Sequence, residues 1–217
     1  MSFPSELFEK LRGVSLCQLA DCLGPAWPIE TRIGPLDPQF CVCGPAVTVA
    51  CEPDDNLTLH HALHIAPPDS VLVVTAGGSC EAALWGELMS ISAQSRRLMG
   101  TILDGAARDP VEIKSLGYPV FARAVTPRKA RKEKYGQLGV AVRCGAVLIN
   151  PGDIVCADAN GVLAIPCSYG TEILSRVLTL AQREVELREE LRNGRSVFEI
   201  SQLDRLVPGH ARWEKEP

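Results

Sequence analysis

The sequence predicts an α/β fold, a layered sandwich of helices and a sheet with mixed strand pairing. Apolar runs typical of strands alternate with helical patterns up to about residue 125. Between residues 139 and 166, four short β-rich runs are separated by turn residues. With 217 residues, 46% hydrophobic and 22% charged, the chain has the composition of a single globular domain over 1–217.

Each element before residue 125 is predicted from its local pattern. Two short helical patterns come first, and Gly24, Pro25 and Pro28 end them. Strands and helices then follow in turn, and Pro45 marks the first strand as bulged or at a sheet edge. The predicted ranges are helices 5–11 and 15–23, strand 40–51, helix 56–66, strand 70–75, a helical stretch to Met99 with Gly86 inside it, strand 100–103, a helix from Asp109 and strand 118–124.

The C-terminal part of the chain predicts hairpins and one long helix. The β-rich runs are GVAVRC, AVLI, DIVCAD and VLAIP, separated by Gly145, Pro151-Gly152 and Asn160-Gly161. Asn-Gly between apolar runs favours a tight hairpin. A helix over 171–192 then ends at Asn193-Gly194.

Charge, cysteine content and hydropathy exclude several classes of function. Lys and Arg number 22 and Asp and Glu 26, a net charge of −4, so there is no basic excess for generic nucleic-acid binding. No apolar run approaches the ~18 residues of a membrane span, and the first residues lack the pattern of a signal peptide. The nine cysteines lie mostly in apolar runs, which favours free thiols over a thiolate metal site and points to the cytoplasm.

The segment DGAARDPVE, residues 104–112, follows an apolar strand and therefore lies where α/β folds tend to bind ligands. Arg108 and Asp109 would point to opposite faces of a regular strand, so they can share a site only if the chain turns there. Pro110 favours a turn because it disfavours the α conformation at residue 109. Two interpretations stay open: Asp109 caps the following helix, with Glu112 in its first turn, or Asp109 binds a metal or anion.

Residues 85–89, WGELM, follow the glycine turn at Gly77-Gly78. A glycine just before a helical stretch frees backbone N–H groups that can bind a carboxylate or phosphate. The alternative is that Gly86 only permits close packing and that Glu87 favours the positive end of the helix dipole.

Glu184 falls inside the apolar stripe of the last helix, on a projection of about 100° per residue. A carboxylate on a buried face needs a partner. That partner is either Arg188, four residues further on, or a site on another subunit to which this helix face delivers Glu184.

Two further polar groups receive structural interpretations. Asn56, His60 and His64 share a helical face, but no downstream Cys or His completes a metal site, so we interpret them as polar positions of a capped helix. The basic segment 128–134 is interpreted as a solvated loop, with a binding role as the alternative.

Three motifs together resemble the RraA-like family. They are G-G-x(7)-G-E-L from Gly77, D-G-A-A-R-D from Asp104 and N-P-G-D-I-V-C-A-D-A-N-G-V-L-A-I-P from Asn150. The resemblance covers roughly residues 14–200. The family includes class II 4-hydroxy-4-methyl-2-oxoglutarate aldolases and regulators of ribonuclease E activity. The motifs are specific to the family and much less specific to one function within it.

The resemblance implies a fold, an assembly and a site. The fold would be an α-β-β-α sandwich of the swivelling β/β/α type, in trimers or hexamers, with the helix 171–193 packing at a subunit interface. Asp109 would bind Mg²⁺ or Mn²⁺. Arg108 would bind the keto, later enolate, oxygen of a pyruvyl group. The backbone N–H groups of Leu88 and Met89, which follow Gly86, would hold its carboxylate. Glu87, which replaces a common Asp, and Glu184 from a neighbouring subunit would hold water around the metal.

The implied activity is that of a divalent-metal-dependent lyase. It would cleave 4-hydroxy-4-methyl-2-oxoglutarate, or a related 4-hydroxy-2-oxo acid, to pyruvate and decarboxylate oxaloacetate through the same enolate. The alternatives are a non-enzymatic regulator that binds a ribonuclease or helicase, and another lyase or hydrolase on the same scaffold. The extended helix with Glu184 favours the aldolase. A small 2-oxo acid is then the expected partner, with no membrane and no direct nucleic acid.

Overall fold

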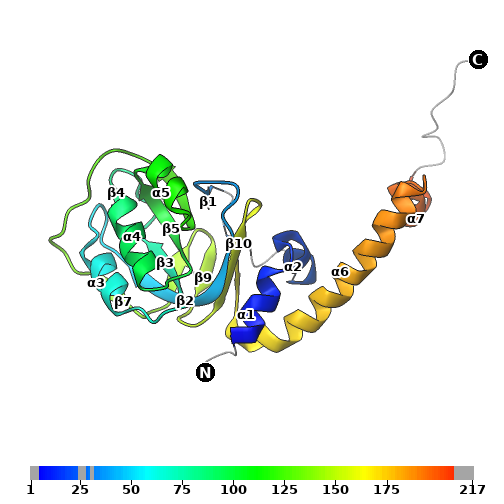
Figure 1. Ribbon diagram of the computed structural model, residues 1–217, viewed down its shortest axis with the longest axis horizontal. Coiled ribbons are helices and arrows are strands. Elements are labelled where there is room, and N and C mark those ends of the chain that lie inside the picture. Colours follow the sequence, from blue (N-terminus) through cyan, green and yellow to red (C-terminus); the bar gives the residue numbers. More distant parts are fainter. Residues whose placement is uncertain (1–4, 24–27, 30–31, 208–217) are drawn as a thin grey trace, which may run out of the picture. The chain divides into compact units, whose positions relative to one another are not determined.

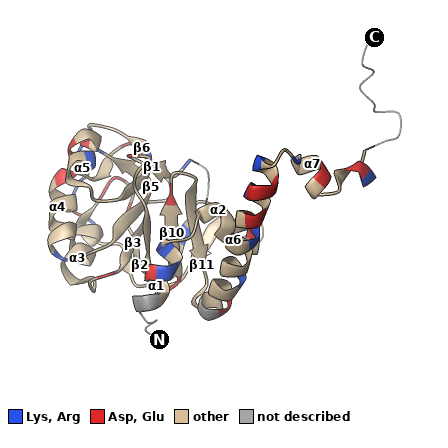
Figure 2. Ribbon diagram, turned by 45° about the vertical axis from the view of Figure 1, so that its right-hand side comes forward, with Lys and Arg blue, Asp and Glu red and all other residues tan. Residues whose placement is uncertain are grey.

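The computed structural model describes residues 5–23, 28–29 and 32–207, and the chain divides into two units (Figure 1). The first unit, residues 1–177, contains the described strands. The second unit, residues 178–217, contains the C-terminal part of helix α6 (Gly170–Arg192) and two short helical turns. Figure 2 marks acidic and basic residues along the ribbon of this part of α6. The packing of this helix at a subunit interface stays a prediction.

A nine-stranded mixed sheet forms the centre of the first unit. Its parallel part has the order β6 (Val120–Val125), β5 (Gly100–Ala107), β3 (Val71–Thr75) and β2 (Val42–Ala50). The hairpin of β10 (Ile154–Asp158) and β11 (Gly161–Ile165) continues the sheet antiparallel to β2. The remaining strands are β1 (Gly34–Pro35) on β6, β4 (Ala83–Trp85) on β5, β7 (Gln137–Leu138) on β2, and the separate hairpin of β8 (Val142–Cys144) and β9 (Val147–Ile149). The predicted α/β fold with mixed strand pairing is confirmed.

Strands β2 and β10 separate two hydrophobic cores, because successive side chains of a strand point to opposite faces. Val42 and Val155 belong to the larger core, whereas their neighbours Cys43 and Ile154 belong to the smaller one. Helices α3 (Leu57–Ile65), α4 (Glu87–Ser95) and α5 (Pro110–Leu116) pack on the larger core. Helices α1 (Ser5–Arg12), α2 (Leu16–Leu23) and the start of α6 pack on the smaller one.

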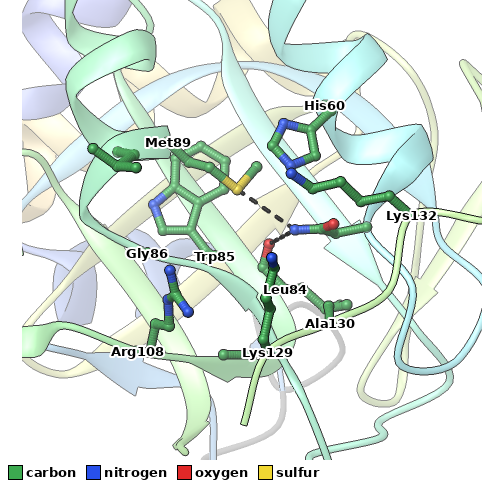
Figure 3. A pocket seen from close by; sticks show the side chains of 12 residues that line it. His60, Leu84, Trp85, Gly86, Met89, Arg108, Lys129, Ala130 and Lys132 are labelled. Carbon is green, nitrogen blue, oxygen red and sulfur yellow. Dashed lines mark hydrogen bonds between the residues drawn. The ribbon is translucent and has the colours of Figure 1, made fainter. Parts of the chain in front are cut away.

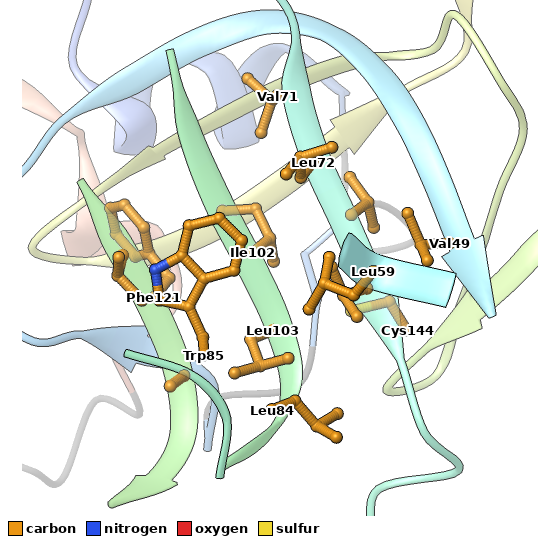
Figure 4. Close-up of a cluster of buried hydrophobic side chains, with 14 of the residues drawn as sticks. Val49, Leu59, Val71, Leu72, Leu84, Trp85, Ile102, Leu103, Phe121 and Cys144 are labelled. Carbon is orange, nitrogen blue, oxygen red and sulfur yellow. The ribbon is translucent and has the colours of Figure 1, made fainter. Parts of the chain in front are cut away.

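The larger core is shown in Figure 4 and gathers around the parallel strands. Four successive residues of β3, Val71 to Val74, are fully buried, as expected of a parallel strand covered on both faces. Leu59 from α3 and Ile102 from β5 are also fully buried. Each such side chain contributes about 1.5–3 kcal/mol through burial. This core therefore fixes the strand ends from which the polar segments emerge.

Two predicted boundaries before residue 110 are wrong. Strand β5 does not end at residue 103 but runs through Asp104 and Gly105 to Ala107. Asp104 stays in the strand because its buried carboxylate is paired: Oδ1 accepts from Arg123 Nε at 2.6 Å and Oδ2 from the Gly145 N–H at 2.8 Å.

The stretch before Met99 is not one helix with Gly86 inside it. Strand β4 pairs with β5 first, and α4 begins only at Glu87. Three residues are too few to show the periodicity of a strand.

All nine cysteines are free thiols, and Cys43, Cys144 and Cys156 are buried. None of the helices in the described ranges combines the length and apolar character that a membrane span requires.

Candidate active site

Arg108 and Asp109 directly follow β5, and the backbone turns at Asp109. This residue adopts a left-handed conformation, with φ 59° and ψ 45°, and Pro110 begins α5 immediately after it. The turn brings the two side chains together, with Arg108 Nε 3.3 Å from Asp109 Oδ2. The turn predicted from Pro110 is therefore present. Left-handed backbone at a residue other than glycine costs free energy and is concentrated at functional sites.

Asp109 occupies the N-cap position of α5, but its side chain makes no capping hydrogen bond to that helix. Its carboxylate instead turns towards α4, where Oδ2 accepts the Glu87 N–H at 3.1 Å. The side chain remains 35% exposed. The capping interpretation thus describes the backbone position of Asp109 but not its carboxylate, which is available to a ligand.

Gly86 makes this arrangement possible. It precedes α4 in an extended conformation that any residue can adopt, so its backbone does not require glycine. The requirement comes from space. A Cβ atom at residue 86 would lie 2.7 Å from Asp109 Oδ2 and 3.1 Å from Arg108 Nε. The absent side chain lets the carboxylate and the guanidinium approach the start of α4.

We expect Gly86→Ala to displace the Asp109 carboxylate while leaving the fold intact. A misplacement of about 1 Å at a reacting centre can lower a rate by ~100-fold. We therefore expect a loss of that order in the catalytic activity proposed below. Gly34→Ala is the matched control, because a Cβ at Gly34 would meet no atom within 4 Å. Equal activities of the two variants would contradict this role of Gly86.

The first turn of α4 offers backbone donors. The N–H groups of Leu88 and Met89 lie where no carbonyl of the same helix can accept them. The turn itself is rigidly placed: Trp85 is buried, donates from Nε1 to Ser90 Oγ at 2.8 Å and stacks on Tyr118. Such a helix start binds anions through its N–H groups and its dipole.

A pocket lies between α3, the start of α4 and the basic loop 128–134 (Figure 3). Its walls include predicted residues and residues that the sequence analysis did not assign to the site. The predicted ones are Gly86, Leu88, Met89 and Arg108, and the others include Asn56, His60, Lys129 and Lys132. Asp109 and Glu87 adjoin this lining through Gly86. Asn56 and His60 share a helical face, and this was the signal in the sequence that could have placed them in the site.

Asp55 holds the basic loop against the pocket. This buried carboxylate accepts hydrogen bonds from the N–H groups of Glu133 at 2.8 Å, Lys134 at 3.0 Å and Leu57 at 3.0 Å. Burial raises its pKa, but these backbone donors outweigh burial, so the pKa of Asp55 lies below its usual value. A charged carboxylate therefore anchors the loop and fixes the place of Lys132.

The pocket is electropositive. Arg108, Lys129 and Lys132 line it, and its lining contains no carboxylate among the residues that the structure describes. Asn56 is held by donating from Nδ2 to the Leu84 carbonyl at 2.9 Å and to Met89 Sδ. The predicted loop thus carries two lysines that face a pocket, which favours the binding alternative for this segment. The arrangement suits a small acid.

Glu184 lies in the second unit, residues 178–217. Its Oε2 accepts from Arg188 Nη2 at 2.7 Å, which is the i,i+4 pair predicted as one alternative. Its delivery to a neighbouring subunit stays a prediction.

Two aspartates of the recognised motifs hold the scaffold. Asp104 links β5 to β6 and to the β8–β9 hairpin, as described above. Asp153, in the N-P-G-D motif, is buried and accepts hydrogen bonds from the N–H groups of Asn150 at 2.8 Å and Cys167 at 3.1 Å. Both carboxylates therefore stabilise the fold by joining separate segments of the chain.

Comparison with known proteins gives concordant results. The family model described as RraA-like, Aldolase/RraA, matches residues 16–164. A protein of Halalkalibacterium halodurans named "Putative 4-hydroxy-4-methyl-2-oxoglutarate aldolase" is 32% identical over 184 residues, which cover 85% of this chain and 87% of that protein.

Two solved structures resemble this fold. One is an uncharacterized protein from Pseudomonas syringae pv. tomato, with a TM-score of 0.83, 23% identity and coverage of 92% of this chain and 98% of that chain. The other is RraAS2 of Streptomyces coelicolor, described as an unusual member of the RNase ES inhibitor RraA protein family. It has a TM-score of 0.76, 28% identity and coverage of 90% and 99%.

Proposed function

Because the chain belongs to the RraA-like family, we propose that it is a divalent-metal-dependent pyruvate aldolase. It cleaves 4-hydroxy-4-methyl-2-oxoglutarate or a related 4-hydroxy-2-oxo acid to pyruvate, and it decarboxylates oxaloacetate as a side activity. The names of relatives such as the Halalkalibacterium protein support the aldolase branch. The observation that carries the proposal is the Asp109 carboxylate, held beside the Arg108 guanidinium and the first turn of α4.

The donor set at Asp109 fits a hard cation such as Mg²⁺ or Mn²⁺. Asp109 Oδ2 is held by the Glu87 N–H and Arg108, and within the described ranges no protein group bonds its Oδ1. Those ranges also contain no cluster of three His, Cys, Asp or Glu side chains that could hold a metal. Mg²⁺ does not need such a cluster, because it commonly takes one or two carboxylates and completes its shell with water and substrate oxygens. When bound, the cation would act as a Lewis acid for the 2-oxo acid.

The residues around Asp109 have complementary roles in this proposal. The N–H groups of Leu88 and Met89 bind the carboxylate of the pyruvyl group. The Arg108 guanidinium binds the 2-keto oxygen and stabilises the negative charge that grows there as the enolate forms. Glu87, and Glu184 of a neighbouring subunit in a trimer or hexamer, complete the polar shell around the cation.

The basic wall of the pocket supports a substrate with a second acidic group. Lys129 and Lys132 line the pocket from the basic loop, so the far end of a dicarboxylic acid bound on the first turn of α4 would meet positive charge (Figure 3). Both 4-hydroxy-4-methyl-2-oxoglutarate and oxaloacetate carry a carboxylate at that end.

The second candidate is a non-enzymatic regulator of a ribonuclease. The description of the Streptomyces relative as a member of a ribonuclease-inhibitor family favours it. A further lyase or hydrolase on the same scaffold is the third. Both alternatives lack the requirement for a pyruvyl substrate, so one assay separates them from the aldolase.

The test is pyruvate release from 4-hydroxy-4-methyl-2-oxoglutarate and from oxaloacetate, with Mg²⁺ and with excess EDTA. We expect turnover of both acids with the metal and loss of turnover with EDTA. Activity on oxaloacetate alone would keep the site and point to another aldol substrate. No metal-dependent release from either acid, by a folded protein, would overturn the proposal and leave the regulator and the other lyase or hydrolase as the alternatives.

A further inference from the structure

Aldol cleavage of a 4-hydroxy acid requires a base for the proton of the 4-hydroxyl group. Neither Asp109 nor Arg108 suits this task, since the first is proposed to hold the cation and the second is a permanent cation. The base must face the end of the substrate that leaves as a carbonyl compound, away from the pyruvyl end. Among the described residues that line the pocket, His60 on α3 is the one titratable side chain to which the proposed mechanism gives no role.

His60 is well placed to reach a substrate. It lines the same pocket as Gly86 and Arg108 but lies on the other side, as Figure 3 shows. Its backbone is fixed within α3, where the His60 N–H donates to the Asn56 carbonyl at 3.0 Å. A substrate with its carboxylate on the first turn of α4 would therefore extend its other end towards the imidazole.

The surroundings of His60 favour the neutral imidazole. Partial burial and the nearby Lys132 ammonium both lower the pKa of His60 below its usual value. The other charged groups on the pocket wall, Lys129 and Arg108, are also cations. The carboxylate of Asp55, on the segment before α3, is engaged by the backbone of the basic loop. An uncharged imidazole near neutral pH can accept a proton.

We propose that His60 is the general base for cleavage of substrates that carry a 4-hydroxyl group. An imidazole nitrogen takes the hydroxyl proton, and the O–H electron pair forms the new C4=O bond. The C3–C4 bond breaks, and its electrons form the C2–C3 double bond of the enolate, with negative charge on the C2 oxygen beside Arg108. The enolate then takes a proton from water at C3 to give pyruvate, and the imidazolium releases its proton to solvent. This inference rests on the proposed aldolase function.

If His60 is the general base, its loss should affect aldol cleavage and oxaloacetate decarboxylation differently, although both reactions take place in the same site. Oxaloacetate has no 4-hydroxyl group, and its decarboxylation forms the same enolate with loss of CO₂, so it needs no such base. A residue that only shaped the pocket would affect both reactions alike. The ratio of the two activities therefore isolates proton transfer from substrate binding.

The experiment compares His60→Gln and His60→Ala with His64→Gln in the full chain. His64 is the control because it lies one turn further along α3, is exposed and does not line the pocket. We expect both His60 variants to lower kcat for aldol cleavage by ~10²- to 10⁴-fold and to lower decarboxylation far less. In the wild type, the acid limb of the pH profile for cleavage should be set by a group with a pKa below the ~6.5 of an ordinary histidine. In the His60 variants this limb should disappear.

Three results would overturn the inference. Unchanged aldol cleavage in His60→Gln would overturn the role of His60 and leave the proposed function in place. Equal losses of cleavage and decarboxylation in both variants would do the same, since equal losses indicate a binding or structural role. A wild-type protein that releases pyruvate from neither acid would overturn the proposed function and this inference with it. The first two results leave the metal-dependent enolate chemistry of Asp109 and Arg108 intact, so the two failures are distinguishable.

Discussion

Replacing Asp109 by alanine is expected to abolish metal-dependent pyruvate release and to leave the chain folded. Asp109 is the carboxylate that we assign to the cation, and even removal of an indirect support for a metal ligand commonly costs about 10- to 100-fold. We therefore expect a loss of at least ~100-fold from this variant. The measurement is pyruvate release at saturating Mg²⁺, with a thermal melt of the same sample.

Two further variants separate the charge of Asp109 from its backbone. Asp109→Asn keeps an oxygen for the Glu87 N–H and tolerates the left-handed conformation, yet it lacks the charge that a cation requires. Asp109→Gly removes the cost of that conformation, so it should match or exceed the wild-type Tm while remaining inactive. Full activity in Asp109→Ala or Asp109→Asn would refute the metal assignment.

Replacing Arg108 by alanine is expected to lower kcat by about 10²- to 10³-fold, with a smaller change in KM. In the proposed mechanism the guanidinium strengthens its interaction as negative charge develops on the enolate oxygen, and removal of one such donor typically costs this much. Arg108→Lys should recover part of the activity, because it restores the charge without the planar fork of donors.

Arg128→Ala is the control for this loss of charge. Arg128 is exposed, pairs with Glu81 at 3.4 Å and lies in the basic loop outside the pocket lining. We expect near wild-type turnover from it. A rise in KM at constant kcat in Arg108→Ala would show that Arg108 only binds substrate, and it would remove the charge-stabilising role.

Local sequence signals predicted one wall of the site and missed the other. Pro110 indicated the turn at Asp109, and Gly86 before a helical stretch indicated the start of α4, to which we assign the carboxylate of the substrate. Both signals are local, since each depends on a residue and its immediate neighbours. The structure then explains their joint action: residues 86 and 109 meet because β4 pairs with β5.

The missed wall depends on contacts between distant parts of the chain. His60 and Lys132 come from segments that are separated by four strands and two helices, and a buried carboxylate at Asp55 brings them together. The segment 128–134 has no periodic pattern that would indicate whether its lysines face a pocket or the solvent. The extension of β5 through Asp104 was missed for the same reason, because its partners Arg123 and Gly145 follow much later.

The anchoring of the basic loop by Asp55 has a consequence for substrate affinity. Residues 128–136 contain no helix or strand, and a free loop of this kind would lose conformational entropy when a ligand ordered it. Here the Glu133 and Lys134 N–H groups are already bound to a buried carboxylate. The cost of ordering this segment is thus met during folding, so a substrate meets a preorganised wall and keeps more of its interaction energy as affinity.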